Sequence, residues 1–191
     1  MARSEALAAA VPGWRIPLNA DRLGGHARPS MNEADVLLAM AEVAVALLGF
    51  AAIVSVFRQR GTWRPDGRFW AMIAAGIGTL VFSLLPLPLL FGGITQASTW
   101  QTCDALLGAY ALGYCAFLTR SFRRDRATDS APNVSIFALL LSGSALNGAL
   151  LVLSAFGYLG DPQFWPYLVG LIWFQIVTAV FFVRLLVVWL R

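Results

Sequence analysis

The stretch LLAMAEVAVALLGFAAI, residues 37–53, contains a single charged residue, Glu42, in a run of apolar and small side chains. A bilayer core about 30 Å thick is crossed by roughly 20 mostly apolar residues in a helix. The apolar run extends over about residues 35–57 and ends before Arg58. Its length predicts a transmembrane helix, in which the carboxyl group of Glu42 needs an explanation.

Four more apolar segments follow, at about residues 69–92, 98–119, 134–156 and 164–189. Backbone groups in lipid must form hydrogen bonds within their own segment, so each segment is expected to be a helix. Pro86 predicts that the second helix bends or ends there. Of the 191 residues, 59% are hydrophobic and 13% are charged, about half the charged fraction of a soluble domain. We therefore predict an all-α, polytopic integral membrane protein with five transmembrane helices.

Eight of the 14 basic residues, which are all arginines, lie in two of the four predicted connections. Arginine clusters mark the cytoplasmic side of membrane proteins, and the other two connections carry no charge apart from Asp161. We predict an N-terminus outside, a cytoplasmic C-terminus and a multi-pass location in the bacterial cytoplasmic (inner) membrane. The clustered residues are Arg58, Arg60, Arg64 and Arg68 in the first connection, and Arg120, Arg123, Arg124 and Arg126 in the third.

The first 33 residues differ from the rest of the chain, because they contain four arginines and three prolines. We predict a poorly structured tail over residues 1–33 and a five-helix transmembrane domain over residues 34–191. Met31, followed by the acidic Glu33 and Asp35, is a plausible natural start with a charge suited to the outer side. The mass of the native N-terminal peptide would test this start.

Polar side chains recur on the small-residue faces of the predicted helices. Glu42 shares a stripe with Ala46, and Asp104 shares one with Gly108, at helical spacings. Small faces normally point at neighbouring helices rather than at lipid. Both acids lie roughly 10 Å inside the outer ends of their helices. We therefore expect an intramembrane polar site made of Glu42, Asp104, Asn147, Ser83, Gln101 and Gln175.

This polar layer has no basic counter-group in the sequence. Two carboxylates cannot both stay charged in a low-dielectric layer unless water or a cation reaches them. Ionisable residues inside a membrane are candidates for function. The interpretation we favour is that both acids are protonated or hydrated and hold helices together through hydrogen bonds, and the alternative is that Glu42 and Asp104 handle a proton or a cation.

Sequence motifs for catalysis and metal binding are missing. The chain has no P-loop, H-E-x-x-H, G-x-S-x-G or C-x-x-C motif, and Gly76 and Gly78 fit helix packing. Cys103 and Cys115 lie about 18 Å apart along one predicted helix, beyond the reach of a disulfide. With a single histidine, His26, no metal-ligand cluster forms. We expect no metal and no cofactor, and favour a non-enzymatic role over an enzyme.

Residues 41–70, AEVAVALLGFAAIVSVFRQRGTWRPDGRFW, resemble the opening of a group of small, uncharacterised bacterial inner-membrane proteins. The resemblance implies a bacterial origin and agrees with a start at Met31. It implies no activity and no catalytic residues.

Five helices with short connections and several small-residue faces leave surface for self-association. We therefore expect a homo-oligomer in the lipid bilayer, acting as a cation- or proton-handling assembly. The alternative is a non-catalytic scaffold or accessory subunit that binds a protein partner through the arginine-rich loops. These loops also fit anionic lipid or nucleic acid. Because topology accounts for the arginines, we expect no nucleic-acid partner.

Overall fold

The computed structural model describes residues 31–58, 67–126, 134–160 and 163–189. These residues form helices and no strand. The helices are α1 (Met31–Arg58), α2 (Gly67–Leu84), α3 (Pro86–Phe91), α4 (Gln96–Arg126), α5 (Val134–Ala155) and α6 (Phe164–Trp189). The predicted tail, residues 1–33, lies almost entirely outside the described residues, because the description begins with α1 at Met31.

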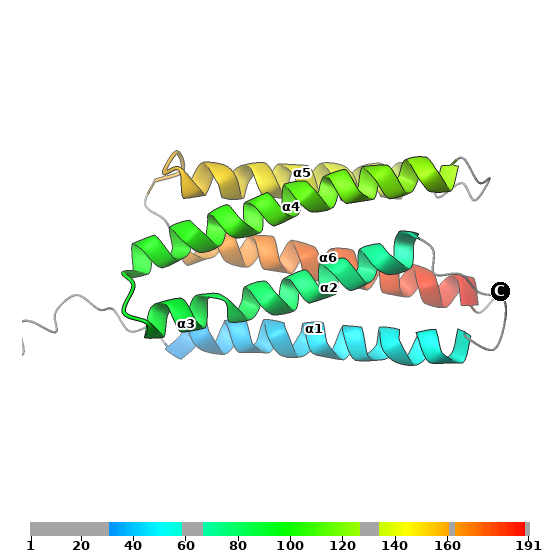
Figure 1. Ribbon diagram of the computed structural model, residues 1–191, viewed down its shortest axis with the longest axis horizontal. Coiled ribbons are helices and arrows are strands. Elements are labelled where there is room, and N and C mark those ends of the chain that lie inside the picture. Colours follow the sequence, from blue (N-terminus) through cyan, green and yellow to red (C-terminus); the bar gives the residue numbers. More distant parts are fainter. Residues whose placement is uncertain (1–30, 59–66, 127–133, 161–162, 190–191) are drawn as a thin grey trace, which may run out of the picture.

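Five helical spans are long and apolar enough to cross a membrane, with α2 and α3 together making the second one. The prediction of an all-α protein with five membrane-spanning helices is therefore confirmed, and the chain is a multi-pass membrane protein. Figure 1 shows the spans running side by side along the long axis of the molecule. We call the two ends of the bundle the Trp100 end, where α1, α4 and α6 begin, and the Arg123 end, where α2 and α5 begin. Which end faces the cytoplasm stays a prediction.

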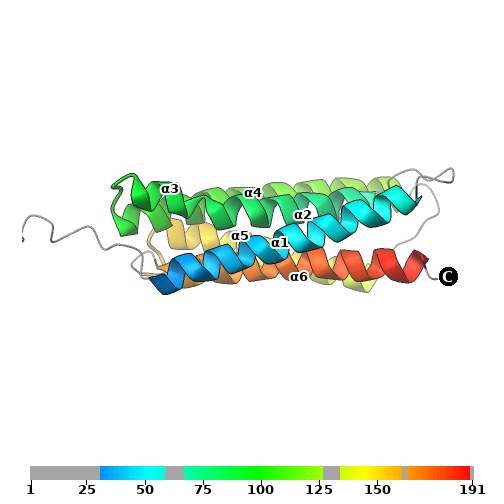
Figure 2. The ribbon, with the colours of Figure 1, turned by 90° about the horizontal axis from the view of Figure 1, so that it is seen from below.

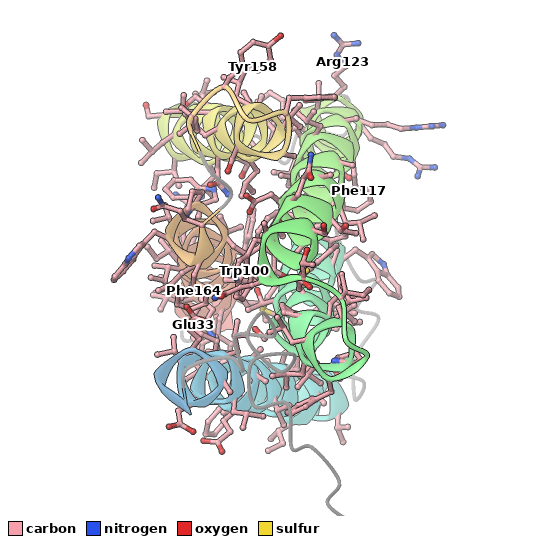
Figure 3. All side chains as sticks on the ribbon, turned by 90° about the vertical axis from the view of Figure 1, so that its left-hand side faces the viewer. Glu33, Trp100, Phe117, Arg123, Tyr158 and Phe164 are labelled. Atoms are coloured by element: carbon pink, nitrogen blue, oxygen red, sulfur yellow. The ribbon has the colours of Figure 1, made fainter. Side chains whose placement is uncertain are left out.

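Helix α6 lies at the centre of the bundle and packs against α1, α2, α4 and α5. Helices α1 and α5 occupy opposite edges, as the view along the bundle shows (Figure 3). The turned view in Figure 2 shows α1 crossing in front of the other helices. The core between them is closed by fully buried apolar side chains such as Leu107, Leu151, Leu171 and Phe174. This arrangement leaves one broad side of α1 without a neighbour among the described residues.

The second span breaks where the sequence predicts it. Pro86 has no backbone N–H, so the carbonyl of Phe82, four residues earlier, loses its helical hydrogen bond. The hydroxyl of Tyr167 on α6 donates to that carbonyl instead. Helix α2 ends at Leu84, and α3 begins at Pro86. The prediction of a bent or terminating helix is confirmed, and a tyrosine from another helix replaces the missing bond.

Glycines let α2 approach its neighbours closely. A Cβ atom added at Gly78 would lie 2.4 Å from the ring of Tyr110, and one added at Gly76 would lie 2.8 Å from Leu48. Because Gly78 has no side chain, the Tyr110 hydroxyl reaches the carbonyl of Ala74 and donates to it at 2.6 Å. The prediction that these two glycines serve helix packing is confirmed.

Candidate functional site

The carboxyl group of Asp104 is the most enclosed acid among the described residues. It lies on α4, about 12 Å along the helix from Gln96, and its side chain is 0% exposed. Ser154 on α5 donates a hydrogen bond from its Oγ to Asp104 Oδ2 at 2.7 Å. The other oxygen, Oδ1, is buried and has no hydrogen-bond partner in the described part of the chain. One carboxyl oxygen therefore has a hydrogen-bond partner, and the other has none among the described residues.

The surroundings of Asp104 are apolar or weakly polar. Cys103, the preceding residue, is fully buried, and Trp100 lies one helical turn away on the same side of α4. The Trp100 ring packs against Tyr167, with ring centroids 5.8 Å apart. The acid has no charged partner within the described residues. Large buried side chains therefore surround the acid, and no described side chain neutralises it.

Several buried polar atoms in the bundle share this lack of a partner. High-resolution structures leave very few buried polar groups unpaired, so these atoms are candidates for contact with a species beyond the described residues. One of them lies beside α6, because a Cβ atom on Gly170 would be 3.5 Å from Asn147 Nδ2. The unpaired atoms are Ser83 Oγ, Thr99 Oγ1, Trp100 Nε1, Asp104 Oδ1 and Asn147 Nδ2.

Asp104 and Asn147 lie at different depths, although both are buried. Asp104 is bonded to Ser154, and Asn147 precedes Ser154 by two helical turns, which is about 10 Å along α5. The polar layer predicted from the sequence is thus spread over several levels. Ser83, Asp104 and Asn147 point into the bundle as predicted, but each has its own surroundings.

The two predicted glutamines act as ties between helices. Gln101 Nε2 donates to the carbonyl of Ala155 at the end of α5, at 2.8 Å. Gln175 Nε2 donates to the carbonyl of Met40 on α1, at 2.7 Å. Both amide groups therefore satisfy backbone oxygens of another helix. Neither is bonded to Asp104.

The expectation that Glu42 faces the bundle beside Asp104 is wrong for the single chain. Glu42 and the rest of its small-residue stripe are exposed, while Leu37, Ala41 and Ala44 on the opposite side of α1 are buried. The packed side of α1 also includes Ala51, and Leu48 fits over Gly76 of α2. The exposed stripe consists of Asp35, Ala39, Glu42, Ala46 and Gly49.

Residues missed by the sequence analysis complete the surroundings of Asp104. Ser154, Thr99 and Trp100 are buried polar residues near the ends of their helices, and Tyr167 is bonded to Phe82. Ser154 follows Asn147 by seven residues, so helical periodicity puts the two on the same face of α5. That spacing was a usable signal for Ser154. Only the structure shows that Trp100 and Tyr167 are buried.

The predicted basic loops are described only in part. Arg120, Arg123 and Arg124 are exposed on the last turns of α4, and Figure 3 shows Arg123 projecting from the bundle. The remaining members of the two clusters have side chains outside the part of the chain that the structure describes. These are Arg58, Arg60, Arg64, Arg68 and Arg126.

Across the described ranges, no three His, Cys, Asp or Glu side chains gather as metal ligands would. Both cysteines there are free thiols, with Cys103 buried and Cys115 half-buried. No protein-family model, curated protein or solved structure matches the chain. The geometry of the bundle is therefore the basis on which a function is assigned.

Proposed function

We propose that this multi-pass membrane protein takes up a proton or a small cation at Asp104, and that it works as a homo-oligomer. The observation that carries the proposal is the state of the Asp104 carboxyl group. It is fully buried, one oxygen is bonded to Ser154, and the other has no partner within the described residues.

An ionised Asp104 would be costly, because a buried charge is stable only when it is paired and hydrogen-bonded. A neutral Asp104 can donate its proton from Oδ2 to the hydroxyl of Ser154, which leaves only its carbonyl oxygen, Oδ1, without a partner among the described residues. An ionised Asp104 would need a cation or water from beyond the described residues. The proposal therefore requires that Asp104 exchange between these two states, whereas a static hydrogen bond between two helices would keep it neutral.

Access to Asp104 is expected from the Trp100 end. Toward the other end, the bundle is filled by Leu107, Leu151, Leu171 and Phe174, which are all fully buried. The described residues form no continuous polar path toward the Arg123 end. Uptake and release at one face therefore require no rearrangement of the apolar core, whereas transport across the membrane requires one.

The test compares Asp104→Asn with Glu42→Gln, since both remove an acid from a membrane span and only the first changes the buried one. Each variant is reconstituted into liposomes with a pH-sensitive dye, and proton uptake is followed after a pH step. We expect Asp104→Asn to abolish the uptake and Glu42→Gln to leave it unchanged. The carboxylic C=O stretch in the infrared difference spectrum should disappear in Asp104→Asn alone.

Two results would contradict the proposal. One is uptake that survives in a folded Asp104→Asn protein, for protons and for Na⁺ or K⁺ alike. The other is loss of uptake in Glu42→Gln only, which would move the function to the exposed face of α1. Circular dichroism and gel filtration of each variant show whether it is folded.

A scaffold role is the second proposal, supported by the exposed arginines at the Arg123 end. Arg120 and Arg123 are both exposed on the last turns of α4, where they are available to an acidic protein surface. Replacing the four arginines of the third connection by glutamine should release a bound protein partner at moderate salt. Retention of the same partner by that variant would exclude these residues as the binding surface.

A further inference from the structure

A pocket of about 610 Å³ opens at the Trp100 end between α1, α4 and α6. It is separate from the Asp104 carboxyl group, which does not line it. Figure 3 looks onto this end of the molecule, where Glu33, Trp100 and Phe164 lie close together. The volume falls within the range of about 300–1,000 Å³ that is common for small-molecule sites. The size and position of the pocket raise the question of what it binds.

Glu33 is the only ionisable side chain among the described residues that line the pocket. It accepts one hydrogen bond within the described chain, a long one of 3.4 Å from Gln96 Nε2 to its Oε2. The described part of the lining contains no basic side chain that would neutralise it. The charge of the pocket therefore favours a cation and disfavours a phosphate or a carboxylate.

Three aromatic side chains also line the pocket. Trp100, Phe164 and Trp165 all line the pocket, and the Phe164 ring lies 5.2 Å from that of Trp100 and 6.3 Å from that of Trp165, between centroids. Trp100 is 1% exposed, and its buried Nε1 has no partner in the described chain. Trp100 therefore lies behind the lining, and Phe164 and the 67% exposed Trp165 are the rings that a ligand in the pocket can contact.

We propose that this pocket binds a substituted ammonium ion. Aromatic faces beside a carboxylate attract such ions, since the ring quadrupole and the carboxylate both favour positive charge, and methyl groups on nitrogen pack against the rings. A small metal ion would gain little from the aromatic lining, and a neutral ligand would gain no charge attraction from Glu33. The ammonium group can come from a free organic cation or from a lipid headgroup.

The test measures binding of choline by titration calorimetry to the protein in phosphatidylglycerol nanodiscs. The neutral isostere 3,3-dimethylbutan-1-ol serves as the matched ligand. We expect choline to bind at least about tenfold more tightly than the isostere, and Glu33→Gln to remove most of that difference. Trp165→Leu should weaken choline binding about threefold or more, and this exposed residue is replaced without risk to folding. Glu42→Gln is the control for removal of an acid from α1.

The source of the ammonium group follows from a second titration, in nanodiscs that contain phosphatidylcholine. A weaker apparent affinity for choline there means that the lipid headgroup occupies the pocket. An unchanged affinity means that the pocket takes a free cation. Both results support an ammonium site. Equal binding of choline and its isostere would overturn the proposal, as would full choline affinity in both Glu33→Gln and Trp165→Leu.

Discussion

Two acids lie at a similar distance from the Trp100 end of their helices, and their surroundings are opposite. Asp104 on α4 is fully buried and bonded to Ser154. Glu42 on α1 is exposed, in a stripe of small residues. Both are roughly two to three helical turns from the Trp100 end of their span. The difference arises from the side of the helix on which each acid lies, because Asp104 faces α5, whereas Glu42 lies on the exposed side of α1.

The contrast shows that depth alone does not determine what an intramembrane acid does. For Asp104, the protein chain supplies a hydrogen-bond partner, Ser154, and covers the carboxyl group with buried side chains. For Glu42, the surroundings of the single chain are lipid, where a charged side chain costs several kcal/mol unless it is covered or neutral. Asp104 is thus a candidate for chemistry inside one chain, and Glu42 is a candidate for contact between chains.

The largest expected effect compares a glycine beside α4 with one on the exposed face of α1. In Gly78→Ala the new methyl group meets the Tyr110 ring at 2.4 Å, whereas nothing lies within 4 Å of a Cβ atom on Gly49. Overpacking costs about 1–3 kcal/mol, and the gain of alanine over glycine in a helix applies to both variants, so it cancels in the comparison. We expect the two variants to differ by about 1–3 kcal/mol in free energy of unfolding, measured by SDS titration in mixed micelles. Equal stabilities would show that the close α2–α4 contact is absent.

The next effect tests the hydrogen bond that distinguishes Asp104 from Glu42. Ser154→Ala leaves the Asp104 carboxyl group buried without any partner from the described residues. Loss of such a bond to a buried acid is expected to cost about 2 kcal/mol. Ser142→Ala is the matched control, because Ser142 is exposed and bonded only to the carbonyl of Leu139 in its own helix. If both variants melt at the same temperature, Ser154 does not hold Asp104.

How far the sequence predicts this bundle depends on the element. Apolar length was enough to predict all five spans, and Pro86 predicted the break that ends α2 at Leu84. The buried face of α4 was also predictable, because Asp104 and Gly108 lie on one small-residue stripe of the helix. In α1 the argument from small residues fails. Both of its sides carry alanines, so periodicity does not distinguish the side with Leu37 from the side with Glu42.

The site was predictable only in part for the same reason. Helical spacing identifies which residues share a face, but not which faces of two helices meet or at what relative height. Asp104 and Asn147 were correctly expected inside the bundle, yet their levels depend on how α4 and α5 slide against each other. Trp100 is fully buried rather than interfacial because Phe164 and Tyr167 of α6 cover it. No local pattern in the chain records that contact.

A smaller effect concerns the tyrosine that replaces the bond lost at Pro86. Tyr167→Phe removes the donor to the Phe82 carbonyl and keeps the ring packed against Trp100. The buried carbonyl is left without that bond, at a cost of about 1 kcal/mol. Tyr158→Phe is the control, since Tyr158 is 78% exposed. In detergent, the midpoint temperature of thermal unfolding should fall for Tyr167→Phe alone. An equal fall in both variants would show that Tyr167 has no special role.

The smallest expected effect on the single chain, and the sharpest test of the other acid, concerns Glu42. Glu42→Ala should change the free energy of unfolding of the monomer by less than about 0.5 kcal/mol, as for exposed substitutions in general. In a homo-oligomer that covers the α1 face, the same change should weaken association.

Cys103 and Cys115 are first replaced by Ala, and a single cysteine is then placed at Ala46 or, as a control, at Ile176. Both positions are exposed and lie about 18–19 Å along their spans.

Oxidation in native membranes should give a disulfide-linked dimer for Ala46→Cys and little for Ile176→Cys, and Glu42→Ala should reduce the first product. Equal cross-linking at the two positions would mean random collision, and none at either would leave Glu42 facing lipid. In that last case the acid must be neutral, because a lone carboxylate has no partner among acyl chains. Both acids would then lie in surroundings of low dielectric. Packed side chains form those surroundings for Asp104, and acyl chains form them for Glu42.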